Sequence, residues 1–189
     1  MRGCLQNFVF VSALLLPLAL RAEPLVKVVR QDDAYLVRVE SAIAADTAVA
    51  WQVLSDYNRL ADFVPDMRVS RVVSAPGEAR RIEQQGEAGF LLFKFVIDVE
   101  LAIAETPPQR LAFRATRGNM RRMQGEWRIE PAAHGILLLY EAELAPAFWV
   151  PPVIGPLVLR RDIASQIAGV VREIERRQSA VQPCAEPPK

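Results

Sequence analysis

Residues 91–103, with the sequence LLFKFVIDVELAI, carry the most regular alternation of side chains in the chain. Every second residue from Leu91 to Ile103 is apolar, and the charged residues Lys94, Asp98 and Glu100 fall between them. A period of two indicates a β-strand with one face against a hydrophobic core and the other face in water. This pattern is typical of antiparallel sheets, so the strand predicts a sheet of that type.

Shorter runs of β-branched and alternating residues flank this strand on both sides. We predict further strands at 25–29, 35–43, 68–74, 80–85, 110–116, 120–129 and 136–144. Turn-forming residues separate the strands at 31–33, 76–77, 86–89, 107–109, 118–119 and 134–135. Connections this short join antiparallel neighbours. The polar strands 68–74 and 80–85 are expected near an edge or a bend of the sheet.

Three segments have helical patterns. Asp46 is predicted to cap a short helix at 48–54 with its side-chain oxygen, and a second short helix at 57–63 is predicted to end at Pro65. Residues 157–177 are predicted to form a long amphipathic helix. Its apolar stripe consists of Leu159, Ile163, Ile167, Val170, Val171 and Ile174. Its solvent face is predicted to carry Arg160, Arg161, Arg172, Glu173, Arg176 and Arg177.

This order of elements predicts an α+β fold built on one curved antiparallel sheet. The apolar face of the sheet has to be covered, and the long helix has the longest apolar stripe available to cover it. One helix is too narrow to fill a strongly bent sheet, so we expect a cavity between the sheet and the helix. Apolar cavities of this kind bind small molecules.

Residues 48–65, AVAWQVLSDYNRLADFVP, resemble the start of START-like domains of the SRPBCC superfamily. The resemblance is closest to the cyclase/dehydrase and coenzyme Q-binding branch, through Trp51, Asp56-Tyr57, Phe63-Val64-Pro65 and Ser70-Arg71-Val72. It implies a helix-grip fold, in which a curved antiparallel sheet wraps around a long C-terminal helix and two short helices follow the first strand. It also implies a hydrophobic cavity, because such domains bind lipids, quinones, polyketides or hormones, and some close polyketide rings.

The composition excludes several other classes of function. There are 23 basic and 22 acidic residues, and this balance disfavours nucleic-acid binding driven by bulk charge. One histidine, His134 in a predicted turn, and two cysteines leave little material for a metal site. No Gly-x-Ser-x-Gly motif and no Cys/His pair is present. We therefore expect no catalytic residue, no metal and no cofactor.

The ends of the chain are predicted to lie outside the folded domain. Arg2, the apolar residues 8–20 and Ala22 predict a cleaved signal peptide at 1–22, and the alternative is an uncleaved N-terminal anchor. The apolar run is shorter than the about 20 residues that span a bilayer. We expect a periplasmic or secreted monomer with a hairpin extension at 23–33, a START-like domain at 34–178 and a disordered, Pro-rich tail at 179–189. Cys184 in this tail would then have no second cysteine for an internal disulfide.

The predicted site is the apolar interior rather than a catalytic constellation. The residues expected to line or border the cavity are Phe63, Phe93, Phe95, Phe113, Met123, Trp127, Tyr140, Phe148, Trp149, Ile163 and Ile167. Tyr140 is the clearest inward proton donor, and Arg121 is a second possibility. We interpret Tyr140 as a core tyrosine with a satisfied hydroxyl. Phe148 and Trp149 belong to the apolar segment 147–154 and would gate the cavity or contact a membrane, and the alternative is plain hydrophobic packing.

A second feature is a group of arginines around the turn at 118–119. They are Arg110, Arg114, Arg117, Arg121 and Arg122. They fit either a contact with an anion or lipid headgroup or a solvated strand face paired with Asp98, Glu100 and Glu126, and the second interpretation is favoured.

Three hypotheses of function follow. The first is an exported, non-enzymatic binder or carrier of a hydrophobic small molecule, with a transient membrane contact. The second is a polyketide cyclase or dehydrase, which needs polar groups inside the cavity. The third is a protein-interaction module with a filled core.

Overall fold

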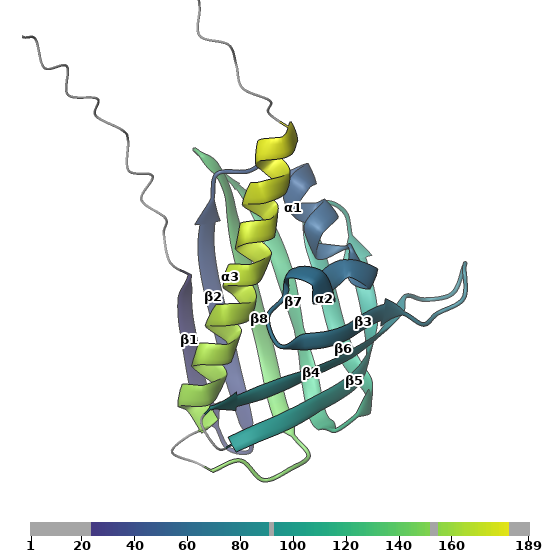
Figure 1. Ribbon diagram of the computed structural model, residues 1–189, viewed down its shortest axis with the longest axis vertical. Helices are drawn as coiled ribbons and strands as arrows, with labels where there is room; N and C mark the ends of the chain where they lie inside the picture. The colour runs from purple at the N-terminus through teal and green to yellow at the C-terminus, as the bar shows by residue number, and fades with distance from the viewer. Residues whose placement is uncertain (1–23, 91–92, 152–154, 182–189) are drawn as a thin grey trace, which may run out of the picture.

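One eight-stranded antiparallel sheet forms the body of the molecule (Figure 1). The computed structural model describes residues 24–90, 93–151 and 155–181. The strand order is β1-β2-β8-β7-β6-β5-β4-β3, so the polar strand β3 lies at an edge with β4 beside it, as predicted. The strands are β1 (Leu25–Gln31), β2 (Ala34–Ile43), β3 (Met67–Val72), β4 (Arg81–Phe90), β5 (Phe93–Thr106), β6 (Arg110–Gly118), β7 (Met120–Ala132) and β8 (Gly135–Pro146).

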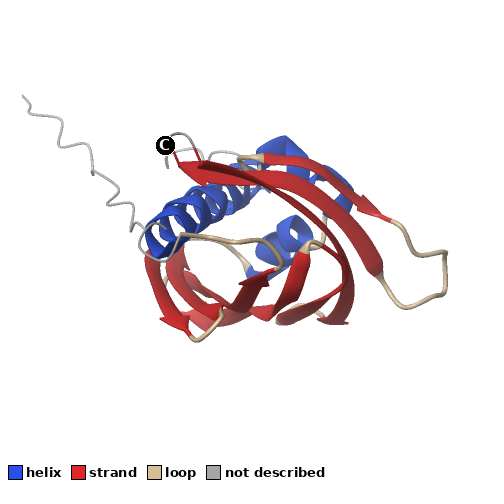
Figure 2. Cartoon of the chain, turned by 90° about the horizontal axis from the view of Figure 1, so that it is seen from below, coloured by secondary structure: helices blue, strands red, loops and turns tan. Residues whose placement is uncertain are grey.

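The sheet is strongly bent, and Figure 2 shows its strands curving around the helices. The pairing register shifts between Glu100 and Leu101 on β5 and between Met120 and Arg122 on β7. Such bulges add a residue to one strand and increase the local bend and twist. Gly118 ends β6 with a φ of 115°, and a side chain there would collide with the backbone of β5. Glycine is therefore required at this corner of the sheet.

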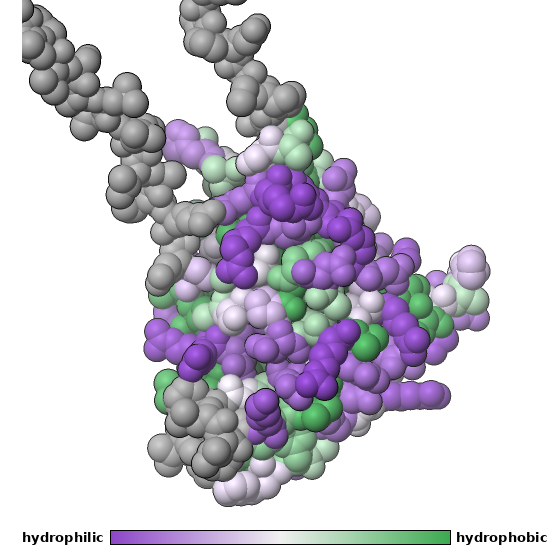
Figure 3. All heavy atoms as spheres, viewed as in Figure 1, coloured by the Kyte–Doolittle hydropathy of each residue, from purple (hydrophilic) through white to green (hydrophobic). Residues whose placement is uncertain are grey.

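The long helix α3 (Gly155–Val181) lies across the concave face of the sheet (Figure 2). The predicted apolar stripe of α3 faces the core, since Ile163, Ile167, Val170 and Ile174 are all buried. On the face seen in Figure 3, hydrophobic atoms form scattered patches between hydrophilic ones. No helix in the described ranges is both long enough and apolar enough to cross a membrane. The arrangement confirms the predicted α+β helix-grip fold.

Three short elements follow β2 at the upper end of the molecule in Figure 1. They are α1 (Thr47–Leu54), the 3-10 turn η1 (Tyr57–Arg59) and α2 (Leu60–Phe63). The predicted second helix at 57–63 is thus a 3-10 turn followed by one α-helical turn. The predicted capping by Asp46 is wrong, because its side chain makes no cap hydrogen bond. Instead, the Gln178 amide of α3 donates to Asp46 Oδ2 at 3.1 Å and accepts from the Asp46 N–H at 2.9 Å.

Two further expectations are corrected by the structure. The predicted turn at 86–89 is part of β4, and Gly86 pairs with Ile97 of β5 and with Met67 of β3. A Cβ on Gly86 would lie 2.7 Å from the Asp66 carbonyl oxygen, so this glycine permits a close backbone approach inside a strand. Glu173, predicted to face solvent, is buried.

Several predictions concern residues at the chain ends. The predicted signal peptide at 1–22 and Cys184 lie outside the described residues. Within the predicted tail, residues 179–181 belong to α3, and the rest lies outside the described residues. The extension at 23–33 contributes β1, which pairs with β2 along its whole length.

Candidate functional site

Two adjoining cavities lie between the sheet and α3. The lower lobe has a volume of about 170 Å³ and is bordered by β4, β5, the ends of β7 and β8, and the first turns of α3. The upper lobe has a volume of about 130 Å³ and lies under α1 and α2, beside the middle of α3. Six residues border both lobes, and we call them the waist: Met67, Gln84, Met123, Tyr140, Ile163 and Gln166.

The size and lining of the lobes define what they can hold. Ligand pockets are about 300–1,000 Å³ in volume, so the two lobes together reach the lower end of that range. Met67 and Met123 at the waist are unbranched, and methionine side chains adapt readily to new contacts. Most other lining residues are apolar. The lobes are therefore suited to a small or slender apolar molecule.

Eight of the eleven residues predicted from the sequence border these lobes. Phe95 and Phe148 line the lower lobe, and Phe113, Trp127 and Ile167 line the upper lobe. Met123, Tyr140 and Ile163 belong to the waist. Stacked rings of Phe95 and Phe148, with centroids 5.1 Å apart, join β5 to the segment before α3. The Tyr140 ring is 4.6 Å from Trp127 and 6.0 Å from Phe113.

The remaining three residues are not part of the lining. Phe63 lies under the guanidinium of Arg177, at 5.9 Å from ring centroid to Cζ. Trp149 is 75% exposed. The Phe93 side chain lies outside the described part of the structure.

Tyr140 is the first polar group in the cavity. It is buried on β8, and burial raises the pKa of its hydroxyl, which therefore stays protonated. Tyr140 is a core tyrosine, as predicted, but among the described residues its hydroxyl has no hydrogen-bond partner, contrary to the predicted satisfied hydroxyl. A hydroxyl at the waist without a protein partner is free to bond a ligand.

Asp162 is the second polar group, and it was not among the residues predicted from the sequence. It lies on α3 and is 9% exposed, and its Oδ2 accepts the Gly89 N–H at 2.9 Å. Burial raises the pKa of the Asp162 carboxyl, and nearby Asp66 raises it further, while the Gly89 hydrogen bond and Arg161 lower it. Its position in the sequence gave little signal, because a residue next to Ile163 is turned about 100° away from it around the helix and lies at the border of the apolar stripe.

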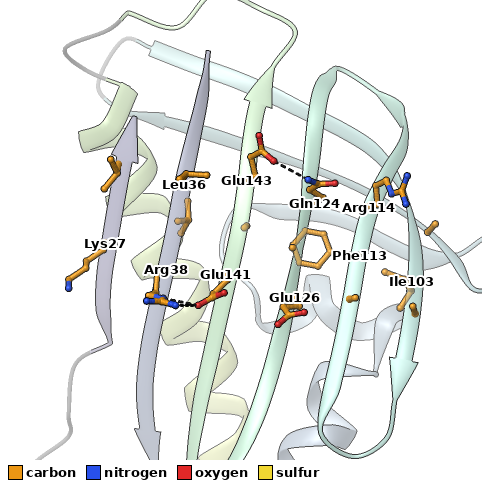
Figure 4. Close-up of a pocket in the computed structure, with 17 residues that line it drawn as sticks. Lys27, Leu36, Arg38, Ile103, Phe113, Arg114, Gln124, Glu126, Glu141 and Glu143 are labelled. Atoms are coloured by element: carbon orange, nitrogen blue, oxygen red, sulfur yellow. Dashed lines mark hydrogen bonds and ion pairs between the residues drawn. The ribbon is translucent and has the colours of Figure 1, made fainter. Parts of the chain in front are cut away.

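A third hollow lies on the outer face of the sheet (Figure 4). It is open and has a volume of about 880 Å³, larger than either lobe. The charged residues on its floor are largely paired: Arg38 binds Glu141, and the Gln124 amide donates to Glu143 at 3.0 Å. An apolar ligand there would stay in contact with water and lose little hydrated surface, so the inner lobes are the better candidate site.

The arginines around the turn at 118–119 are mostly ion-paired. Arg110 contacts Glu126 at 2.6 Å, Arg122 contacts Glu143 at 2.6 Å, and Arg121 contacts Asp33 at 3.2 Å. These contacts favour a solvated strand face paired with acidic residues. Among the described residues, Glu126 is the one predicted partner that contacts these arginines, and Glu100 contacts Arg81 instead.

Comparisons with known proteins agree with this geometry. A family model described as polyketide cyclase/dehydrase and lipid transport matches residues 43–171. No curated protein matches the chain in sequence. Among solved structures, the Zhui aromatase/cyclase from Streptomyces sp. R1128 is similar, with a TM-score of 0.65 and 17% identity over 80% of this chain and 98% of that chain.

Two further solved structures belong to proteins of other descriptions. A STAR-related lipid transfer protein from Xanthomonas axonopodis has a TM-score of 0.57 and 13% identity, covering 79% of this chain and 98% of that chain. A START superfamily protein from Mycobacterium smegmatis has a TM-score of 0.58 and 12% identity, covering 79% of this chain and 99% of that chain. At these identities the likeness shows the fold alone.

Proposed function

Because the chain belongs to the polyketide cyclase/dehydrase and lipid-transport family, we propose that it is a non-enzymatic carrier of a hydrophobic small molecule. The ligand would occupy the lobes between the sheet and α3. One observation carries this proposal: the two lobes are mostly apolar space that the protein leaves unfilled, although the last turns of α3, around the fully buried Ile174, pack closely. An unfilled apolar cavity forfeits packing contacts, so its retention suggests a use.

Binding in this site would depend mainly on burial of apolar surface. Each square ångström removed from water contributes about 25 cal/mol before the cost of immobilising the ligand. Tyr140 would add a hydrogen bond at the waist. No step of this proposal requires a bond to be made or broken.

The proposal also includes export and a brief contact with a membrane. Export is supported by Arg2 and the apolar residues 8–20 at the start of the chain. Membrane contact is supported by Trp149 and Leu157, which are 75% and 59% exposed beside residues that line the lower lobe. Tryptophan favours the interface between water and lipid. The carrier would act as a monomer.

The test is a pair of substitutions on opposite faces of β5. Ile97 lines the lower lobe, whereas its neighbour Val96 is 59% exposed on the outer face. Ile97→Trp should fill the lobe and lower the affinity for an apolar fluorescent probe at least about tenfold. Val96→Trp adds the same side chain outside the lobe and should leave the affinity unchanged. Equal binding by both variants would place the ligand elsewhere.

Native mass spectrometry of protein purified from its own host would identify the ligand class. A co-purifying lipid, quinone or polyketide would support the carrier. A protein that is empty and also indifferent to a panel of such compounds would count against it, and a co-purifying protein would favour an interaction module.

One observation favours the cyclase alternative. Tyr140 and Asp162 both line the lower lobe, and a protonated hydroxyl with a carboxyl group can donate and accept a proton in the same cavity. In a cyclase, Tyr140→Phe would abolish turnover of a poly-β-keto substrate. In a carrier, the same change would alter affinity slightly and no turnover would be detected with either protein.

A further inference from the structure

The charged residues that line the lobes are all of one sign. The lower lobe is lined by Asp66, Glu87 and Asp162, and none of the described residues around either lobe is Lys, Arg or His. Glu87 is neutralised by Arg68, whose guanidinium lies 2.6 Å from its carboxylate. The lining thus offers acceptors and negative charge, with no cation for an acidic ligand.

Asp162 is the acceptor placed to meet a ligand. One of its oxygens, Oδ2, already accepts the Gly89 N–H, and the described part of the chain provides no donor for the other, Oδ1. The residue lines the lower lobe and is 9% exposed, and Oδ1 is not among the described buried side-chain atoms that lack a partner, so Oδ1 faces the open space of the lobe. A ligand that fills the lobe removes water from this oxygen, which is unfavourable unless the ligand supplies a donor in its place.

We propose that the carried molecule is an amphiphile whose head donates a hydrogen bond to Asp162 Oδ1, as an alcohol or a protonated amine does. This inference rests on the proposed carrier function and specifies its ligand. The apolar chain lies in the lobes, and the head lies between α3 and the end of β4. Molecules with carboxylate or phosphate heads are disfavoured, because their charge would lie beside Asp162 and Asp66, and none of the described lining residues is a cation; Arg161, which acts on Asp162, is not part of the lining.

The experiment compares three amphiphiles that share one chain: decylamine, decanol and decanoate. Each displaces an apolar fluorescent probe from the full chain near neutral pH, below its micellar concentration. Decanol and decylamine should bind at least about tenfold more tightly than decanoate, as a hydrogen bond to a charged group implies. Decylamine binding more tightly than decanol would assign the head as an amine, and the reverse order would assign it as an alcohol.

Asp162→Asn tests the assignment to this residue. The amide oxygen of the new side chain can still accept the Gly89 N–H, while its NH₂ group now faces the ligand as a donor. The preference should therefore reverse, with decylamine losing about tenfold in affinity and decanoate gaining. Asp66→Asn should weaken decylamine less and leave decanol unchanged, and it keeps the test decisive if Asp162→Asn does not fold. Glu130→Gln, an exposed change on β7, is the control for loss of one charge.

The outcomes separate the two proposals. If the three amphiphiles bind equally well, the head assignment is wrong and the carrier stands. If decanoate binds most tightly to the unaltered protein, Asp162 acts as a protonated donor and the assignment is also wrong. If none of them displaces the probe, both the assignment and the carrier fail.

Discussion

The two ends of α3 meet the rest of the molecule in different ways. Its C-terminal half packs against α1 and α2, where Ile174 is fully buried and Arg177 contacts both Glu173 and Asp56 at 2.7 Å. Its N-terminal half borders the lower lobe. There, the Gly89 N–H of β4 donates a hydrogen bond to the Asp162 carboxylate of α3. The last turns of α3 are therefore closed by packing and ion pairs, whereas its middle borders the upper lobe and its first turns border the lower lobe.

The position of the short helices explains this difference. In Figure 1, α1 and α2 lie beside the upper half of α3, where Ala50 and Val53 become fully buried. Gly169 lets α3 approach α2 closely, because a Cβ there would collide with the Phe63 carbonyl oxygen of α2 and lie 2.6 Å from Pro65 Cδ. At the lower end the strands β4 and β5 face α3 directly and a lobe remains. Stability and ligand binding should thus respond to substitutions at opposite ends of one helix.

The largest effect on stability should come from Ile174→Ala at the closed end. This side chain is 0% exposed, and its truncation leaves a cavity that the neighbouring elements cannot fill. We expect the free energy of unfolding to fall by about 2–5 kcal/mol in urea denaturation. Val181→Ala, at the exposed end of the same helix, should change it by less than about 0.5 kcal/mol. A loss below about 1 kcal/mol for Ile174→Ala would contradict the close packing of this end.

A smaller effect should come from Glu173→Gln. The Arg176 hydrogen bond is the main cause that lowers the pKa of Glu173 to about 2, with Arg177 adding to it and burial opposing it. At neutral pH we expect a loss of roughly 2 kcal/mol in the free energy of unfolding, reduced from the full shift because Arg176 is exposed to water.

The same pKa predicts a pH dependence with a definite sign. The folded-state pKa of Glu173 lies below its ordinary value of 4.5, so its stabilisation is complete above pH 4.5 and is lost as the pH falls toward 2. The stabilities of the unaltered protein and of Glu173→Gln should converge over that window. Parallel curves would mean that the ion pairs do not set this pKa.

At the open end, Phe148→Ala should affect binding more than stability. Its ring stacks on Phe95 and lines the lower lobe, so truncation removes apolar surface that a ligand would cover. We expect about a tenfold loss of affinity for an apolar probe, with a change of about 1 kcal/mol in the free energy of unfolding. Should the affinity remain unchanged while the stability falls by several kcal/mol, Phe148 would belong to the packed core and not to a ligand site.

Most of the fold could be predicted from local patterns. The alternation along β5 correctly placed Val99 and Leu101 inside, because a period of two depends on the chain alone. The prediction of a turn at 86–89 was wrong because Gly86 serves a close approach by Asp66, a residue distant in sequence. The prediction that Asp46 caps α1 was wrong for the same reason, because its hydrogen-bond partner Gln178 lies 132 residues away in the sequence.

The candidate site could be predicted only in part. Inward aromatic residues such as Phe95 and Phe113 follow from strand periodicity, and both line the lobes. The contact between Gly89 and Asp162 joins residues 73 positions apart and depends on how far the sheet bends. No local pattern encodes that bend, so neither the lobe volumes nor the free Oδ1 of Asp162 could be derived from the sequence.

The smallest effect should come from Trp149→Ala, next to Phe148 in the chain but outside the lobes. Because the indole is 75% exposed, its loss should change the free energy of unfolding by less than about 0.5 kcal/mol and leave the affinity for a soluble probe unchanged. If this end contacts lipid, the binding of Trp149→Ala to sedimented phosphatidylcholine vesicles should be about threefold weaker than that of the unaltered protein. Val73→Ala, which removes an exposed apolar side chain before β4, is the control. Equal vesicle binding by both variants would remove Trp149 from the membrane contact, while Phe148 and the lower lobe would keep their assigned role.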